Sequence, residues 1–403
     1  MFQNLLYSLS GYVLVGSSLV LLRYGAALRR LWREPVLRHP LLIVESDDWG
    51  AGPVQAQATA LDRLRRLLVK HRDAAGRHPV VTLALILAVP DGGAIRTEAH
   101  YVRRPLGDAA FAPVIDAIER GRAAGVFSLQ LHGLEHFWPD SLMACNDPGV
   151  QAWLREDAPP ATERLPSPLQ SRWVDAPTLP SRNHPPERVR AAVAEETELF
   201  ARILGQPAAV VVPPTFVWTR EVEHAWARHG VQTVITPGRR YTCRDGAGRP
   251  GGAEGAFFNG MSEAGVTYLV RDDYFEPERG HTAEDALRAL ARKWSQGRPC
   301  LLETHRSNFI GDPKVAERSL VEIERLYTEA LARYPSLRFA SSEELAAALR
   351  NKNSAWIEPR WRAQVPAWVS RTRALRRFWR LARLTGLAWA MDAFAWFCRT
   401  RAG

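Results

Sequence analysis

The chain has 403 residues, enough to bury one large core, and 46% of them are hydrophobic. Its formal charge of +10 is uneven, because residues 1–38 carry a net +4 and residues 352–403 a net +9, which leaves −3 for the middle. A mildly acidic body with two basic ends argues against nucleic-acid binding, and four cysteines without CxxC spacing argue against a zinc ribbon or a disulfide scaffold and favour a cytosolic setting.

An uncharged stretch of 18 residues, Leu5–Leu22, opens the chain and predicts a membrane-associated helix. It is just long enough to span a bilayer, although its four serines also allow a re-entrant or interfacial position. No basic residue precedes it, so it lacks the basic start of a secretory signal. Arginines follow it closely, and the positive-inside rule then predicts a bacterial inner-membrane protein whose body is cytoplasmic.

The middle of the chain alternates between apolar runs and segments of helical periodicity. The runs at 41–44 and 80–87 flank a helical pattern at 55–70, which predicts a strand-helix-strand unit. Further helices are predicted at 109–124, 187–204, 220–229, 283–296 and 313–333, and further strands at 127–131, 208–212, 232–236, 266–271, 299–303 and 337–340. Because the strands are apolar throughout, both sheet faces should be covered, and seven or eight such units predict an α/β fold with a distorted parallel (β/α) barrel.

Two long segments interrupt this alternation. Residues 139–186 hold ten prolines, and residues 237–265 are rich in glycine with little periodicity. Loops of this length are usually binding walls or disordered linkers. Each follows a strand that should end at the active face, so we expect both to wall a substrate site.

Acidic and imidazole side chains end two of the predicted strands. Asp47 and Asp48 end the first apolar run, and His132 and His136 follow the run at 127–131. If the chain is helical there, the four-residue spacing of the histidines places both rings on one face. Two histidines and Asp48 would hold a metal ion with one position left open for water, as in catalytic sites.

The C-terminal tail is basic and aromatic. Six of the fourteen tryptophans follow residue 355, and arginines recur between 373 and 383 beside apolar side chains. This pattern predicts a helix on anionic lipid, and the apolar stretch 384–398 suits the headgroup boundary. The alternative is that both ends pack on each other as ordinary amphipathic helices. We divide the chain into an anchor (1–38), a barrel (39–351) and a membrane-associated tail (352–403).

A third strand, at 299–303, leads to His305. In order along the chain, Ser46-Asp47-Asp48, His132-x-x-x-His136 and Leu302-x-x-His305 resemble the motifs of the polysaccharide deacetylase family, the NodB-like carbohydrate esterases. The resemblance covers roughly residues 40–345. Three short motifs in this order at predicted strand ends are fairly specific, and the longer stretch Thr304–Gly311 looks like a bacterial branch of that family.

The resemblance implies a distorted (β/α) barrel of the glycoside hydrolase and deacetylase type, with a divalent ion on Asp48, His132 and His136. It also implies that Asp47 is the general base and His305 the general acid. The chemistry is consistent, since amide hydrolysis needs an acidified water, a proton acceptor and a proton for the leaving amine. Zinc is the default for such ligands, while cobalt, nickel and iron suit them too.

One motif of the family is missing. Its third motif normally supplies an arginine that orients the base, but the matching segment Val211–Trp218, which includes Thr215, has none. Arg271, at the end of another predicted strand, is the expected substitute, and Asp272 or Asp273 is expected to tune the histidine acid.

Other residues near the strand ends have two interpretations. Trp49 and Trp218 are candidate stacking platforms for a sugar or ordinary packing residues. Asp47 is a candidate base or a cap of the following helix. Glu135 and Glu303 are expected to contact the catalytic or metal-binding side chains, or to be solvated, rather than to react themselves.

The sequence therefore predicts a metal-dependent hydrolase that removes an N-acetyl or similar small acyl group from an amino sugar, in a polysaccharide or a lipid-linked precursor, with membrane lipid contacting both termini. One alternative is a glycoside hydrolase or transferase that pairs Asp47 with Glu135 or Asp272. Another is a catalytically inactive membrane scaffold in exopolysaccharide assembly.

Overall fold

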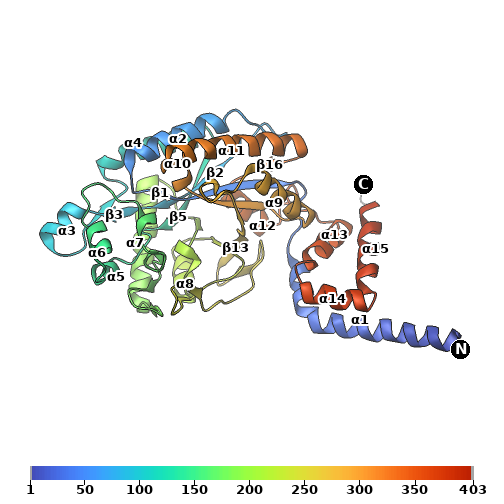
Figure 1. The fold of residues 1–403 in the computed structure, drawn as a ribbon. Coiled ribbons are helices and arrows are strands. Elements are labelled where there is room, and N and C mark those ends of the chain that lie inside the picture. The colour runs from blue at the N-terminus through green and yellow to red at the C-terminus, as the bar shows by residue number, and fades with distance from the viewer. Residues whose placement is uncertain (1, 401–403) are drawn as a thin grey trace.

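The computed structural model describes residues 2–400, with side chains from Gly11 onward. A mainly parallel, curled sheet forms its centre, in the order β12-β13-β9-β8-β5-β2-β1-β15-β14, with β16 paired to β1 (Figure 1). The strands are β1 (Leu41–Gly50), β2 (Val81–Ile86), β5 (Phe127–Gly133), β8 (Val210–Val211), β9 (Thr233–Thr236), β12 (Ser262–Glu263), β13 (Val266–Val270), β14 (Asp273–Tyr274), β15 (Cys300–His305) and β16 (Arg338–Phe339).

One short segment of chain nearly closes the sheet into a barrel. β13 pairs with β9, β14 pairs with β15 at the other end of the strand order, and only residues 271 and 272 separate β13 from β14. The sheet therefore curls until β13, which lies beside the edge strand β12, is joined through two residues to β14 at the opposite edge. This arrangement confirms the predicted α/β class and distorted barrel.

Amphipathic helices cover the outside of the sheet. They are α2 (Val54–Leu68), α4 (Ala112–Ala123), α7 (Pro186–Leu204), α8 (Arg220–Arg228), α9 (Ala283–Ser295), α11 (Pro313–Arg333) and α12 (Ser342–Arg350). In α2, Leu61, Leu64 and Leu68 are buried at the spacing of one helical face. The predicted helix at 55–70 corresponds to α2, which begins at Val54 with Pro53 at its N-cap, so Asp47 does not cap it.

The two long segments contain short elements of their own. Segment 139–186 holds α5 (Pro139–Met143), α6 (Pro148–Trp153), β6 (Val174–Asp175) and β7 (Arg182–Asn183), and segment 237–265 holds the β10–β11 hairpin (Cys243–Arg244 and Pro250–Gly251). The connection after β2 adds β3 (Ala88–Pro90), α3 (Gly92–Glu98) and β4 (Arg103–Pro105), and α10 (Ser307–Ile310) follows β15. Elements this short carry too few residues for periodicity to reveal them.

Helices from both ends of the chain form one compact unit beside the barrel (Figure 1). The terminal helical module consists of α1 (Phe2–Arg33), α13 (Trp361–Thr372), α14 (Arg376–Leu384) and α15 (Leu387–Thr400). Its core joins apolar residues of α1 to residues of the three C-terminal helices, including Val20, Leu28, Val365, Phe378 and Met391. The alternative that the two ends pack on each other therefore describes the second half of α1. The predicted domain boundaries stay predictions.

Part of α1 is long and apolar enough to cross a membrane, by length and composition. The stretch runs from Gly11 to Arg33, and only 11% of its apolar window is buried.

Arg371 ties the terminal helical module to the barrel. Its fully buried guanidinium donates hydrogen bonds to the carbonyl oxygens of Leu31, Glu34, Pro35 and Gln296, at 3.0, 2.6, 2.8 and 2.7 Å. These carbonyls lie at or just beyond the ends of α1 and α9, where helices leave oxygens without partners. A single side chain in α13 therefore provides hydrogen-bond donors for carbonyl oxygens at the ends of two helices.

The Arg371→Met variant is expected to lose about 3 kcal/mol of unfolding free energy, because it leaves buried carbonyls without donors. Urea denaturation followed by circular dichroism measures this loss. Arg373→Met is the matched control, because Arg373 is exposed and its pair with Asp392 is at the surface. Equal midpoints for the two variants would contradict a structural role for Arg371.

Candidate metal centre

Asp47 and Asp48 face the same cavity although they are neighbours in one strand. In a regular strand their side chains would point to opposite faces. The pairing of β1 with β2 shifts register between Ser46 and Trp49, and Asp48 has a φ of 72°. Such a bulge turns an extra side chain inward, and the left-handed backbone of Asp48, which Asp adopts more readily than most residues, is part of that turn.

His132 and His136 converge through a turn rather than a helix. His132 lies in β5, and the chain bends directly after Gly133, whose φ is +119°. A Cβ at Gly133 would approach the carbonyl oxygen of Glu135 to 2.8 Å, so the turn requires glycine. The chain is not helical here, so the condition under which a four-residue spacing would align the rings is not met; the sharp turn brings the two rings to 4.8 Å between centroids instead.

The ligand atoms form a nearly equilateral triangle. Asp48 Oδ1 lies 3.4 Å from Nε2 of His132 and 3.4 Å from Nε2 of His136, and the two nitrogens are 3.2 Å apart. A tetrahedral ion with bonds of ~2.0–2.1 Å has ligand-to-ligand edges of ~3.3–3.4 Å. Asp48 Oδ1 is buried and has no hydrogen-bond partner among the described residues. The three side chains therefore fit a divalent ion.

The protonation states also suit metal binding. His132 Nδ1 lies 2.8 Å from the Val212 carbonyl oxygen, which can only accept, so Nδ1 carries a proton and Nε2 is the nitrogen turned toward Asp48 and His136. Burial would lower the pKa of His132, but Asp47 and Asp48 raise that pKa, so a bound cation would have to displace a proton from Nε2. Burial lowers the pKa of His136 to about 4, so this ring is neutral. Burial alone would raise the pKa of Asp48, but its close contacts with His132 and His136 hold that pKa far below its usual value.

Arg271 binds Asp47 with both ends of its guanidinium. Its Nη1 donates to Asp47 Oδ1 at 2.9 Å and its Nη2 to Oδ2 at 2.6 Å, while Nη1 also reaches Glu45 Oε2 at 3.0 Å. Its Nε lies 3.1 Å from a Glu303 carboxylate oxygen. Burial would raise the pKa of Asp47, but the charge of Arg271 brings that pKa below its usual value. Arg271 is therefore placed where the missing motif arginine was expected.

His305 pairs with Glu276. His305 Nδ1 lies 2.6 Å from Glu276 Oε1, and the other carboxylate oxygen of Glu276 accepts from Asn308. Burial would lower the pKa of His305, but the Glu276 hydrogen bond and the charges of nearby carboxylates raise that pKa to about 10. The imidazole is therefore held as a proton donor.

The prediction that Asp272 or Asp273 tunes the histidine is wrong. Asp272 pairs with Lys293 of α9, and Asp273 pairs with Arg292 and Lys293 of the same helix. Sequence reasoning ended the strand at 271 and so overlooked Glu276, which lies two residues beyond Tyr274. In the sequence, the position of Glu276 just after Asp273-Tyr274 was the signal that could have suggested it as the partner of His305.

These groups border one cavity of about 400 Å³. Glu163 and Gln170 of segment 139–186 form part of its wall, as predicted, and the buried Arg306 fixes Glu163 through bonds of 2.7 and 2.9 Å. Among the described residues, segment 237–265 supplies none of the lining, so that expectation is wrong. Thr215 does line the cavity, next to Phe216.

Neither candidate stacking platform is accessible. Trp49 and Trp218 are fully buried, and their indole N–H groups bond Ser46 Oγ and a Glu223 carboxylate oxygen. They are packing residues, so the interpretation of either as a sugar platform is wrong.

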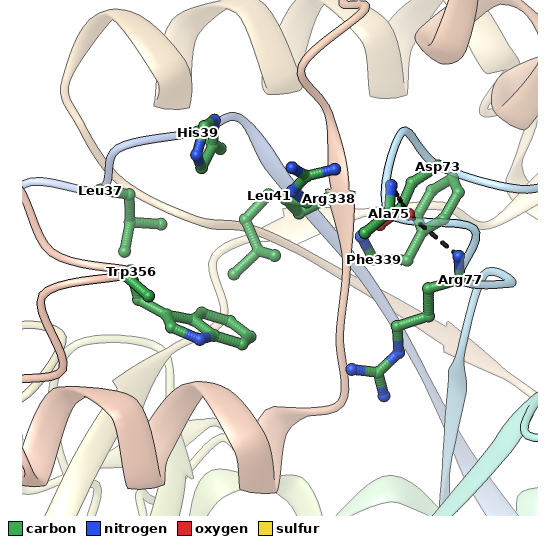
Figure 2. A pocket seen from close by; sticks show the side chains of 10 residues that line it. Leu37, His39, Leu41, Asp73, Ala75, Arg77, Arg338, Phe339 and Trp356 are labelled. Atoms are coloured by element: carbon green, nitrogen blue, oxygen red, sulfur yellow. Dashed lines mark hydrogen bonds between the residues drawn. The ribbon is translucent and has the colours of Figure 1, made fainter.

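A second cavity, of about 300 Å³, lies at the opposite end of β1. Figure 2 shows His39 and Arg338 near Leu41, with Trp356 nearby. Its lining has one carboxylate, Asp73, whose oxygens accept from backbone N–H groups. It contains no set of metal ligands comparable to the first cavity among the residues that line it, so we assign the chemistry to the first cavity.

A scan of the sequence against models of known protein families gave no match, and a search of curated proteins gave none either. A search of solved structures did find similar chains. One is the family 4 carbohydrate esterase from Streptomyces lividans in complex with acetate, at 10% identity and a TM-score of 0.35, covering 76% of this chain and 94% of that one. Another is a family 4 acetyl xylan esterase from Clostridium thermocellum with a cobalt ion, at 12% identity and a TM-score of 0.36, covering 76% and 90%.

The search also found a 4-alpha-glucanotransferase from Thermococcus litoralis, at 10% identity and a TM-score of 0.40. The match covers 77% of this chain but only 40% of the transferase. A functional assignment therefore rests on the residues of the site itself.

Proposed function

We propose that the chain is a divalent-metal-dependent hydrolase of the polysaccharide deacetylase type, which removes an N-acetyl or similarly small acyl group from an amino sugar. The observation that carries this proposal is the Asp48, His132 and His136 triangle, with Asp47 and His305 on the same cavity. Amide hydrolysis needs an ion, a proton acceptor and a proton donor. This cavity offers candidates for all three.

A bound divalent ion would acidify a water molecule and polarise the amide carbonyl, with zinc as the first expectation and cobalt, nickel or iron as alternatives. Asp47 would take a proton from the attacking water, and Arg271 keeps that carboxylate ionised and oriented. His305 would donate its proton to the departing amine.

The charge of the cavity favours a neutral or cationic glycan. Six carboxylates and two arginines line it: Asp47, Asp48, Glu163, Glu276, Glu278, Glu303, Arg271 and Arg279. A divalent ion and a protonated His305 would bring the formal charge of this lining from −4 to −1, so it offers no surplus of positive charge to attract sugars that carry phosphate or carboxylate groups.

The contacts of the paired carboxylates weigh against a glycoside hydrolase. Glu135 is buried between Arg103 and Arg172, and Asp272 pairs with Lys293. Neither lines the cavity that holds Asp47, so neither pairing gives two carboxylates flanking one bond. The position of Arg271 weighs against an inactive scaffold, because the base keeps an orienting partner.

The location we propose is the inner membrane, with the barrel on the cytoplasmic side. The apolar stretch of α1 and the arginines that follow it support this orientation.

Two measurements on the purified full chain test the function. Elemental analysis should find about one divalent ion per wild-type chain and much less in His132→Ala, since one of three ligands is lost. Release of acetate or formate from N-acylated amino-sugar polymers and lipid-linked amino sugars should fall in parallel. His224→Ala, an exposed histidine of α8, is the matched control. Wild-type turnover in His132→Ala would overturn the proposal.

The Glu276→Gln variant should shift the alkaline limb of the kcat profile to lower pH. The reaction needs protonated His305, and Glu276 raises the pKa of that imidazole, so removing the carboxylate lowers the pKa and the acid is lost earlier as pH rises. A series of rates from neutral to alkaline pH measures the shift. Glu278→Gln is the control, because Glu278 lines the cavity but accepts from Ser307 instead. An unmoved limb would remove Glu276 from this role.

A further inference from the structure

The helix α15 has one packed face and one face with exposed tryptophans. Its inner face packs into the terminal helical module through Ala388, Met391, Ala395 and Cys398, at the three- and four-residue spacing of a helix. On the outer face, Trp389 is 77% exposed and Trp396 67%, and the two lie seven residues apart on one side of the helix. Phe394 is partly exposed on another side, where it stacks on Trp361. Two large, highly exposed tryptophans on one face mark an interaction surface.

This aromatic surface continues onto neighbouring helices. Leu381 and Leu384 of α14 are exposed at the corner before α15. That corner touches α1, because Ser17 Oγ bonds the Thr385 carbonyl oxygen at 3.3 Å and a Cβ at Gly16 would approach Thr385 Cγ2 to 2.8 Å. From this contact the N-terminal half of α1 projects beyond the other helices of the module (Figure 1).

Cationic side chains surround the apolar surface. Exposed arginines follow the apolar part of α1 and occupy the outside of α14: Arg23, Arg29, Arg30, Arg376, Arg377, Arg380 and Arg383. Residues 361–400 contain a single acidic residue, Asp392, which pairs with Arg373 at 2.8 Å. Exposed aromatic residues beside exposed arginines match the interface of an anionic bilayer, where rings lie at headgroup depth and arginines meet phosphates.

We propose that the outer face of α15, with the end of α14, lies flat in the interface of an anionic bilayer, beside the point where α1 enters it. This inference extends the membrane location within the proposed function. α15 cannot cross the bilayer, because its inner face is packed in the module. The part of α1 after Leu22 stays outside too, because Tyr24 and Leu28 pack against arginine-rich α14 and α13. The stretch Gly11–Arg33 is therefore not a membrane span as a whole.

Two contacts with one bilayer fix the barrel on the membrane. The module joins the barrel at the start of β1, where Leu37 bridges to Ile357, whereas the metal centre lies at the other end of that strand. The seven residue steps of strand from Leu41 to Asp48 separate the two by about 23 Å. The cavity then lies well clear of the lipid, which favours glycans whose acylated sugars extend from the bilayer over short lipid-linked monosaccharides.

A fluorescent label on α15 tests the proposal in the full chain. Trp396→Cys, in a background with the two partly exposed cysteines replaced (Cys145→Ser and Cys243→Ser), carries an environment-sensitive dye. On vesicles of phosphatidylglycerol and phosphatidylethanolamine, its emission should shift to the blue and be quenched by brominated lipid. The same dye at Val321→Cys, exposed on α11 of the barrel, should do neither. A water-accessible label at position 396 on bound protein would overturn the proposal, as would absence of vesicle binding.

The charge dependence has its own matched pair. Removing two arginines of α14 (Arg380→Gln and Arg383→Gln) should weaken binding to these vesicles by about fivefold per arginine. Removing two exposed arginines of the barrel (Arg63→Gln and Arg325→Gln) should leave it unchanged, and equal effects of the two pairs would count against the proposed surface. Hydrolysis of a soluble N-acetylated oligosaccharide is measured separately, so failed docking and failed catalysis give different results.

Discussion

Replacing Asp47 with asparagine is expected to lower kcat about 10³-fold, the usual range for a lost general base, while the bound metal remains. Asparagine keeps the shape of the side chain but cannot accept the proton of the attacking water. Asp48, His132 and His136 are untouched by the change, so elemental analysis should still find the ion. Acetate release under saturating substrate measures the loss.

The control for this variant is Asp272→Asn, the same change at a residue that the sequence placed near the base. In the structure Asp272 pairs with Lys293 and does not line the cavity. Its turnover should stay within about twofold of wild type, in the range of surface substitutions. If Asp47→Asn turned over like Asp272→Asn, the proton acceptor would have to be another carboxylate of the cavity.

Sequence reasoning located the site because its motifs end parallel strands. The ends of β1, β5 and β15 had to meet at one edge of the sheet, so Asp48, His132 and His305 were bound to approach one another. Apolar runs and helical periodicity are local signals, and they placed the strands and covering helices within a few residues.

Geometry that depends on tertiary contacts was beyond the sequence. The bulge that turns both Asp47 and Asp48 inward leaves no mark on the pattern of residue types. The strand β14 has two residues and forms only because β15 lies beside it, so Glu276 could not be recognised as the partner of His305. Trp49 and Trp218 were ambiguous for the same reason, since burial is a property of the assembled core.

The terminal helices show how one pattern can serve two purposes. A stripe of apolar residues on an amphipathic helix predicts burial but does not say whether protein or lipid provides it. In α15 the inner stripe meets α13, while the outer stripe, with Trp389 and Trp396, remains exposed. The interpretation that the ends pack on each other therefore holds for the inner face, and contact of the outer face with lipid is what we propose.

Arg271 is expected to have the largest combined effect on stability and activity. Its guanidinium is buried among Asp47, Glu45 and Glu303, so Arg271→Met removes the arginine partner of three buried carboxylates. Breaking a buried ion pair in this way costs roughly 4 kcal/mol of unfolding free energy. Turnover should fall about 100-fold or more, since a displaced base loses its alignment. For Arg271→Lys, both the unfolding free energy and the turnover should lie between the values of the wild type and of Arg271→Met, because one ammonium group cannot replace a forked guanidinium.

A second variant separates positioning from stability. Adding Glu45→Gln to Arg271→Met removes one of the orphaned carboxylates, so the unfolding free energy should recover in part while kcat does not. The pH profile gives an independent readout. Arg271 lowers the pKa of Asp47, so its loss raises that pKa and moves the acidic limb of activity to higher pH. If kcat returned together with stability, and the acidic limb stayed in place, Arg271 would be a structural residue that does not act on the base.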